Sequence, residues 1–273
     1  MGGWRRDADG GAGRPEQEPA TDPATTAGRR EQRRHVMSST VGRALRLLEF
    51  VVDGEKTLNQ LAALSGFSRS ATHRLAGELV RHRYLQRSEH GYGLGYRLLE
   101  LGERKKAGLG ISRTAMPLLQ AYCERTGETV HLAVLDGTHI VILERIVGTR
   151  QLQVNAYVGQ RTPAYRTAVG KALISARPER EWPMFLAGMS VDDRRRTQAE
   201  LHAARSHRYA FDLEESNVGV CCVAAAIGCE REHAVAAVSF NGAHLHLTED
   251  RLRALAPVIV ECADEVSRAL QVA

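Results

Sequence analysis

The sequence predicts an α+β protein with two domains joined by a helix. Its 273 residues suggest two domains at the usual size of roughly 100–200 residues each. Helical periodicity dominates residues 38–110, whereas residues 111–273 mix helical and strand-like patterns. Excess positive charge is confined to residues 39–110, which hold twelve Lys and Arg against seven Asp and Glu. A small cationic domain followed by a larger, nearly neutral one is the organisation that fits these observations.

Composition narrows the class of protein. The longest apolar run, Val220–Ile227, has eight residues, far fewer than the roughly 20 that span a bilayer. The N-terminus is charged and rich in glycine, unlike a secretory signal. Five cysteines without a C-x-x-C pair argue against a disulfide framework and against a thiolate zinc site. We therefore expect a cytoplasmic protein that does not contact the membrane.

Residues 1–37 have the composition of a disordered N-terminal extension. They hold six Gly and three Pro, and Val36 is their only member of the Leu, Ile, Val and Phe set. Such a segment buries too little apolar surface to offset the entropy lost on ordering it. The folded part is therefore predicted to start at residue 38.

Three short helices are predicted in the cationic region. Ser39 or Thr40 can cap the first helix. Its expected apolar face consists of Val41, Ala44, Leu45, Leu48, Val51 and Val52. Thr57 and Gln60 form a capping-box pattern that opens the second helix. Ser68 can cap the third helix after a glycine-containing turn, and this helix is expected to run to about residue 82.

A small hairpin follows the third helix. Residues 84–87 and 91–94 have strand character on either side of a three-residue turn. Helix, turn, helix and hairpin together predict a winged helix-turn-helix over residues 38–95. A further helix fills the linker at residues 96–110, which places the second domain at 111–273.

The third helix carries residue types that read DNA. Ala71, Leu75 and Leu79 follow helical spacing and are expected to face the core. The opposite face is predicted to consist of Arg69, Thr72, His73 and Ala76, flanked by Ser70 and Arg74. Short, hydrogen-bonding and cationic side chains suit the base edges of the major groove. Candidate phosphate contacts are Arg43, Arg46, Lys56 and, in the wing, Arg87. The sequence therefore predicts binding to double-stranded DNA, with an ordinary solvated helix as the alternative.

The second domain is predicted as one sheet backed by several helices. Strand candidates are residues 129–135, 139–147, 151–158, 218–228 and 234–241. Helices are expected at about 112–126, 168–177, 192–206 and from Thr248 onward.

The chain resembles the IclR-type transcriptional regulators over about residues 40–270. In the first domain the resemblance rests on residues 40–45 (TVGRAL), 65–75 (SGFSRSATHRL) and 91–95 (GYGLG). In the second it rests on 158–163 (VGQRTP), 167–173 (TAVGKAL), 209–215 (YAFDLEE), 219–225 (GVCCVAA) and 238–242 (VSFNG). Arg83 and Arg208 stand where the family usually has glycine.

The resemblance implies a GAF-like effector-binding domain of mixed α/β structure. It places a small carboxylate against the backbone of Ala168, Val169 and Gly170, at the start of a helix. Free N–H groups and the positive end of the helix dipole suit an anion there. Asp212, Cys222 and Ser239 are implied to line the same pocket. A solvated Lys171, a surface Asp212 and a core Cys222 are the alternatives without a ligand.

The function predicted is that of a DNA-binding transcriptional regulator, not an enzyme, whose operator affinity is controlled by a small organic acid. The operator is expected to be pseudo-palindromic and the protein a homodimer or a dimer of dimers, as two recognition helices require. No H-E-x-x-H motif is present among the histidines, so neither a metal nor a cofactor is predicted. Two alternatives are an enzyme that uses Asp212 as a base or Cys222 as a nucleophile, and a DNA-packaging protein without sequence preference.

Overall fold

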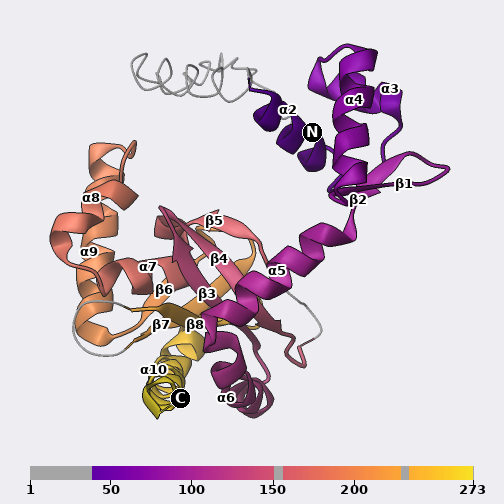
Figure 1. The fold of residues 1–273 in the computed structure, drawn as a ribbon. Coiled ribbons are helices and arrows are strands. Elements are labelled where there is room, and N and C mark those ends of the chain that lie inside the picture. Colours follow the sequence, from indigo (N-terminus) through magenta and orange to yellow (C-terminus); the bar gives the residue numbers. More distant parts are fainter. Residues whose placement is uncertain (1–38, 151–155, 229–233, 273) are drawn as a thin grey trace, which may run out of the picture. The chain divides into compact units, whose positions relative to one another are not determined.

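The computed structural model describes residues 39–150, 156–228 and 234–272 (Figure 1). The predicted disorder of residues 1–37 lies outside these ranges. The chain divides into two compact units between Leu101 and Gly102, inside the helix α5 (Tyr96–Leu109). Within the described ranges, none of the helices has the length and apolar character needed to cross a membrane.

The first unit is a winged helix-turn-helix. Its elements are α2 (Thr40–Glu49), α3 (Leu58–Ser65), α4 (Arg69–Arg81), the paired strands β1 (Leu85–Arg87) and β2 (Tyr92–Leu94), and the start of α5. Ser39 Oγ accepts a hydrogen bond from the Gly42 N–H, and the predicted capping box joins Thr57 and Gln60. Ser68 caps α4. These caps satisfy backbone donors that each helix start leaves free.

The buried face of α2 matches the prediction only in part: Val51 is buried and Ala44 and Leu48 pack against the core as expected. Leu47 and Val51 are the fully buried residues of this segment, whereas Val41, Leu45 and Val52 are more than half exposed. Two apolar stripes run along α2, and periodicity alone does not tell which of them meets the core. The stripe through Leu47 is buried because α2 packs against α3 and α4 on that side.

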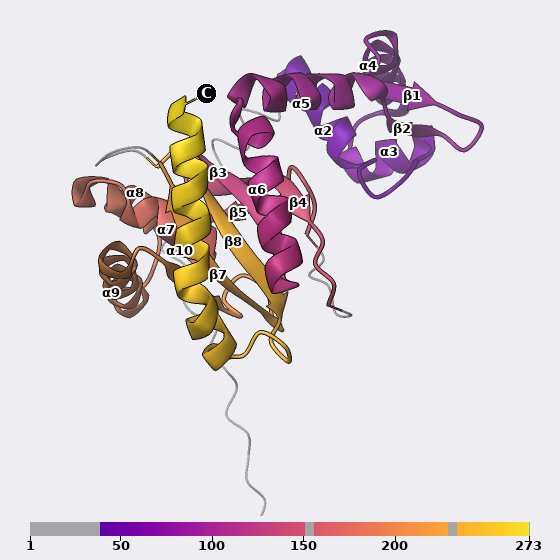
Figure 2. The same ribbon diagram turned by 90° about the horizontal axis from the view of Figure 1, so that it is seen from below.

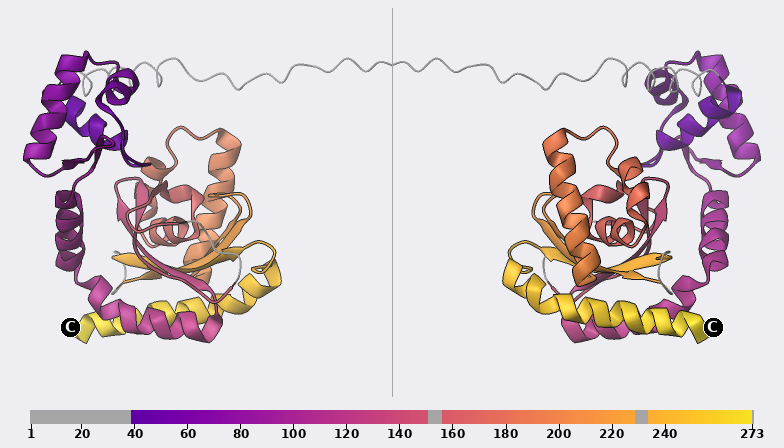
Figure 3. Two further views of the ribbon diagram at one scale, coloured as in Figure 1. Left: turned by 90° about the vertical axis from the view of Figure 1, so that its right-hand side faces the viewer. Right: turned by 90° about the vertical axis from the view of Figure 1, so that its left-hand side faces the viewer.

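The second unit is a six-stranded antiparallel sheet between two layers of helices. The strand order is β5-β4-β3-β8-β7-β6. The strands are β3 (Thr129–Asp136), β4 (His139–Ile146), β5 (Arg161–Pro163), β6 (Ala210–Leu213), β7 (Val220–Ile227) and β8 (Ala236–Ala243). One face carries α6 (Ile111–Thr126) and α10 (Glu249–Val272), which lie side by side (Figure 2). The other face carries the 3-10 turns η1 (Ala164–Arg166) and η2 (Glu179–Glu181), α7 (Ala168–Ser175), α8 (Trp182–Phe185) and α9 (Val191–His207) (Figure 3).

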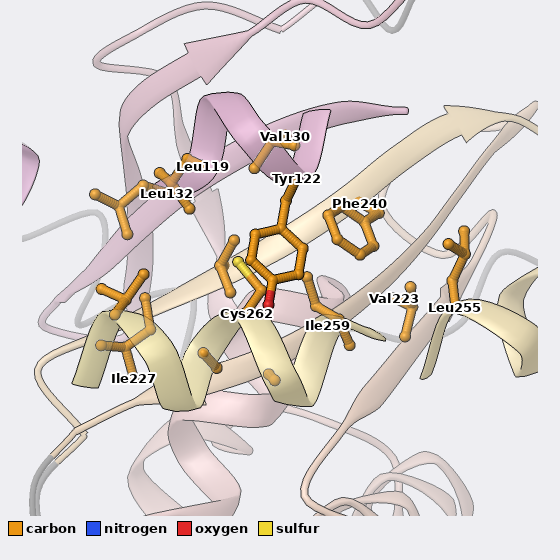
Figure 4. Packing of buried hydrophobic residues seen from close by; sticks show 14 of the residues in the cluster. Leu119, Tyr122, Val130, Leu132, Val223, Ile227, Phe240, Leu255, Ile259 and Cys262 are labelled. Carbon is orange, nitrogen blue, oxygen red and sulfur yellow. The ribbon is translucent and has the colours of Figure 1, made fainter. Parts of the chain in front are cut away.

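Period-two alternation along the strands supplies both faces of the sheet. Val223 and Phe240 belong to the core beneath α6 and α10, where Tyr122 and Ile259 meet them (Figure 4). Cys222 and the other alternate positions belong to the core beneath α7, α8 and α9. Cys221 and Cys222 therefore lie on opposite faces of the sheet.

Two strand predictions need correction. Residues 156–160 do not form a strand, and the rest of the strand predicted at 151–158 lies outside the described residues. The edge strand at this place is β5, and β6 was not predicted at all. Both strands are only three or four residues long, too short for alternation to show.

Two turns hold an arginine in the left-handed backbone region. Arg83 has φ 62° and Arg208, at the end of α9, has φ 67°. Glycine adopts this conformation without steric cost, whereas a side chain with a Cβ does not. Both turns adopt this conformation here although neither residue is glycine.

Candidate functional site

The exposed face of α4 presents four of the predicted DNA-reading side chains. Arg69, Ser70, His73 and Arg74 are all exposed. Arg69 Nε donates to Asn59 Oδ1 at 3.1 Å, which ties the guanidinium to α3. A long cationic side chain held in this way loses less conformational freedom when it meets a base edge.

Thr72 and Ala76 were predicted on this face and lie instead in the core. Both residues are fully buried, and Thr72 Oγ1 donates to the Ser68 carbonyl at 3.1 Å. The buried arc of α4 is wider than predicted because α2, α3 and β1 all pack against it. Thr72 therefore cannot reach a base, and we remove it from the candidate contacts.

The remaining cations around the helices are held against aromatic rings. The guanidinium carbons of Arg43 and Arg46 lie 4.2 Å from the Phe67 and 5.4 Å from the Phe50 ring centroids. Arg87 in the wing lies 6.0 Å from the ring of Tyr92, a residue that also pairs by its backbone with Lys56. Cation–π contacts of this kind orient a charge without neutralising it.

The second unit contains a cavity on the α7 face of the sheet. It is open to solvent, and the space between its walls, counting that opening, is about 500 Å³. Its polar lining consists of His131, Gln160, Thr162, Thr167, Asp212, Ser216, Asn217, Ser239 and Asn241. Its apolar lining consists of Ala133, Ile140, Ile142, Ala156, Ala168, Val169, Val220 and Cys222.

The start of α7 forms one wall of this cavity. Ala168 and Val169 line it, and the first N–H groups of a helix have no carbonyl partner within the helix. The N–H of Gly170 is instead taken by Thr167 Oγ1 at 3.0 Å. Gly170 is not part of the lining; it packs on η1, where an added Cβ would lie 1.9 Å from the Ala164 carbonyl oxygen.

Asp212 is buried at the floor of the cavity and holds a loop. Its Oδ1 accepts from the N–H groups of Glu215 at 2.8 Å and Ser216 at 3.3 Å, and its Oδ2 accepts from the Ser216 hydroxyl. Burial raises the pKa of Asp212, and these hydrogen bonds oppose the shift. Its principal partner is thus the 215–216 loop, which forms part of the cavity wall.

Sheet register brings the other polar groups into rows across the cavity floor. Asp212 on β6 pairs with Cys222 on β7, which pairs with Asn241 on β8. Ser239 pairs with His131 on β3. Asn241 Nδ2 donates to the Thr129 carbonyl and its Oδ1 accepts from Ser239.

His131 is the site residue that the sequence analysis missed. It is 5% exposed, and no hydrogen-bond partner for its Nε2 exists among the described residues. Burial and the nearby charge of Arg145 lower the pKa of His131 to about 4, so the ring is neutral near pH 7. A buried polar nitrogen beside a cavity is costly unless a ligand or water pairs with it.

Lys171 is buried, contrary to the solvated alternative. Its ammonium Nζ lies 2.8 Å from Glu200 Oε2 and 2.6 Å from Glu215 Oε1. Burial alone would lower the pKa of Lys171, but the two carboxylates raise it above its ordinary value. Through Glu215 this ion pair fixes the same loop that Asp212 holds.

A winged helix-turn-helix with a cationic recognition helix, joined to a unit with a polar cavity, defines a ligand-responsive DNA-binding regulator. Comparisons with protein families agree. The description "Bacterial transcriptional regulator IclR C-terminal" matches residues 106–268, and "IclR helix-turn-helix domain" matches residues 40–89. The chain belongs to the IclR family of bacterial transcriptional regulators.

Individual relatives cover nearly the whole described chain. The Escherichia coli regulator XynR is 30% identical over 243 residues, spanning 85% of this chain and 96% of the relative. The Escherichia coli repressor IclR is 27% identical over 83% of this chain and 88% of its own. The crystal structure of Thermotoga maritima IclR superposes with a TM-score of 0.70 at 28% identity, over 85% of this chain and 98% of that one.

Proposed function

We propose that this regulator senses a small organic acid in the cavity and that the acid's carboxylate binds the first turn of α7. The observation that carries the proposal is that one cavity is lined both by Ala168 and Val169, at a helix N-terminus, and by His131, whose Nε2 has no hydrogen-bond partner among the described residues. The helix end favours an anion. His131 and Asn241 then offer hydrogen bonds to a second polar group of the ligand.

A related structure supports this class of ligand. An IclR homologue from Microbacterium hydrocarbonoxydans was solved with 4-hydroxybenzoate, an acid with a second polar group. It is 24% identical to this chain, with a TM-score of 0.72 over 86% of this chain and all of that one. The likeness establishes the shared fold, and we extend the carboxylate class to this protein on the basis of its own cavity.

We further propose that the cavity is not catalytic. A base must be free to turn toward its substrate, and three hydrogen bonds hold the Asp212 carboxylate to the 215–216 loop. A nucleophilic thiol needs a lowered pKa, whereas burial and the neighbouring Asp212 raise the pKa of Cys222 well above its ordinary value. Binding without turnover is the outcome that fits both residues.

At the DNA end we propose a dimer on a pseudo-palindromic operator. Arg69, Ser70, His73 and Arg74 would read bases while Arg43, Arg46, Lys56 and Arg87 meet phosphates. Exposed apolar side chains on α2 and α5 support a second copy, because such groups are normally covered. They are Val41, Leu45, Tyr96 and Leu99, each more than half exposed. A regulator of this kind works where the genome lies, which places it in the cytoplasm.

The carboxylate site is tested by replacing Ala168 with proline. Ala168 is the first residue of α7 and follows an extended Thr167 at φ −118° and ψ 147°, a position that accepts proline. The substitution removes one N–H donor at the cavity wall. We expect benzoate and 4-hydroxybenzoate to raise the Tm of the wild type by roughly 5–10 °C at 100 times Kd, and their affinity for Ala168→Pro to fall at least tenfold.

The matched control is Val191→Pro, the same first-turn position in α9 after Ser190. It is expected to keep the wild-type response to the acids. Benzamide in place of benzoate is expected to give a much smaller shift, since it carries no charge. An unchanged acid affinity in Ala168→Pro would contradict the proposed anchoring point.

Sequence reading by α4 is tested by comparing Arg69→Ala with Arg46→Ala. If Arg69 contacts a base, Arg69→Ala should lose about 1–3 kcal/mol of binding free energy on the operator and little on unrelated DNA. If Arg46 contacts a phosphate, Arg46→Ala should weaken binding to both kinds of DNA. It should also lower the slope of log affinity against log salt concentration by roughly 0.9. The measurement is binding to operator and scrambled duplexes at several salt concentrations. Equal losses on both duplexes for Arg69→Ala would remove this residue from base reading.

A further inference from the structure

We propose that Glu214, Cys221 and His244 form a binding site for Zn²⁺ or a similar divalent cation. The site lies at the ends of neighbouring strands, away from the face of the sheet that lines the cavity. Cys221 Sγ lies 3.5 Å from His244 Nδ1, and the same nitrogen lies 3.2 Å from Glu214 Oε1. Among the described residues this is the group of His, Cys and acidic side chains whose ligand atoms all lie within 4.8 Å of one another.

Two of the three distances between ligand atoms match the edges of a tetrahedral zinc site. Zinc lies about 2.3 Å from a thiolate sulfur and about 2.0–2.1 Å from an imidazole nitrogen or a carboxylate oxygen. At the tetrahedral angle these lengths give a sulfur–nitrogen edge of about 3.5 Å and a nitrogen–oxygen edge of about 3.3 Å. The third pair of ligand atoms, Cys221 Sγ and a carboxylate oxygen of Glu214, lies within 4.8 Å.

The backbone holds the three ligands at the ends of three neighbouring strands. Glu214 follows β6, Cys221 lies near the start of β7, and His244 follows β8. The Glu214 N–H donates to the Val220 carbonyl at 3.0 Å, and the His244 N–H donates to the Gly219 carbonyl at 2.8 Å. These bonds fix the Cα positions of the two loop ligands relative to the sheet.

A hydrogen bond to the second carboxylate oxygen of Glu214 also orients this side chain for binding a cation. Oε2 accepts from the Gly219 N–H at 2.7 Å, which turns Oε1 toward His244. Glu214 occupies the left-handed region at φ 64°, where residues other than glycine are uncommon. The side chain is therefore held in one direction by its own loop.

The chemistry of the three donor atoms determines which metal ions the site favours. A thiolate, an imidazole and one carboxylate favour zinc and similar ions over Mg²⁺ or Ca²⁺, which prefer oxygen ligands alone. Binding breaks the S–H bond of Cys221 and releases its proton to solvent while the sulfur–metal bond forms. His244 binds through Nδ1 as a neutral imidazole. Its side chain is 57% exposed, so a water molecule can complete the fourth position.

The site escaped sequence analysis because its ligands share no short motif. Cys221 and His244 are 23 positions apart and only the pairing of β7 with β8 brings them together. The loop that starts at Glu214 continues through Ser216 and Asn217 into the cavity wall. A bound cation would therefore brace the sensing cavity from outside.

The test is a Co²⁺ and Zn²⁺ titration of the full chain after treatment with a chelator. We expect one Co²⁺ per chain with the charge-transfer absorption of a cobalt–thiolate bond, displaced by Zn²⁺. Cys221→Ser should abolish this absorption. His244→Ala should weaken Zn²⁺ binding at least about 100-fold, since even partners outside the coordination sphere cost 10–100-fold. Because His244 is largely exposed, this variant is expected to fold as the wild type does, which circular dichroism checks.

Two controls separate this site from other thiols and histidines. Cys123→Ser removes a buried thiol on α6, and His246→Ala removes an exposed histidine two residues from the ligand; both should bind as the wild type does. Thiolate absorption that survives in both Cys221→Ser and His244→Ala would assign the metal to another place. A wild type without thiolate absorption at millimolar Co²⁺ would mean that the three residues form only a hydrogen-bonded cluster.

Discussion

Replacing Gly170 with alanine is expected to destabilise the ligand-binding unit by about 1–3 kcal/mol and to abolish its response to organic acids. An added Cβ would lie 1.9 Å from the Ala164 carbonyl oxygen and 2.5 Å from the Ala164 Cα. All of these atoms belong to the backbone of η1 and no flexible side chain is there to move. The first turn of α7 must therefore shift, and Ala168 and Val169 move with it.

The matched control for this variant is Gly102→Ala in α5. Gly102 is also helical, but an added Cβ meets nothing within 4 Å. Alanine there is expected to stabilise the helix by about 0.5–1 kcal/mol. Thermal unfolding with and without 4-hydroxybenzoate measures both effects. Equal Tm values and equal ligand shifts for wild type and Gly170→Ala would show that α7 does not depend on this close contact.

The winged helix-turn-helix could be predicted from the sequence because its signals are local. Ser39, Thr57 and Ser68 each accept a hydrogen bond from a backbone N–H three residues away, so the pattern and the interaction occupy the same few positions. What could not be predicted was which face of each helix packs against the core. Neighbouring helices determine that Thr72 is buried and which side of α2 is exposed. A hydrophobic period of 3.6 residues does not identify those neighbours.

The cavity residues, too, could be predicted from the sequence only in part. Ala168, Val169, Asp212, Cys222 and Ser239 line it, as the resemblance implied, and that they bind an effector stays a prediction. Gly170 packs against η1 instead, and His131 was not among the predicted site residues. His131 becomes a cavity residue through its pairing with Ser239, more than 100 positions along the chain. Contacts set by strand register carry no local signal.

The buried neutral state of His131 gives a second large effect, on the pH dependence of stability. Its folded-state pKa is about 4, against an ordinary value of 6.5. Between these values the unfolded chain binds a proton that the folded chain does not, so stability falls as the pH falls. Across this window the loss attributable to His131 is roughly 3 kcal/mol. His131→Gln, which keeps a polar group in the cavity, should lose that part of the acid dependence.

The measurement is the free energy of unfolding by urea at several pH values from 7 to 4. Carboxyl groups titrate equally in wild type and variant, so the difference between the two curves isolates His131. His246→Gln, which removes an exposed histidine, is expected to retain the wild-type slope. Parallel curves for wild type and His131→Gln would show that the ring is not held neutral.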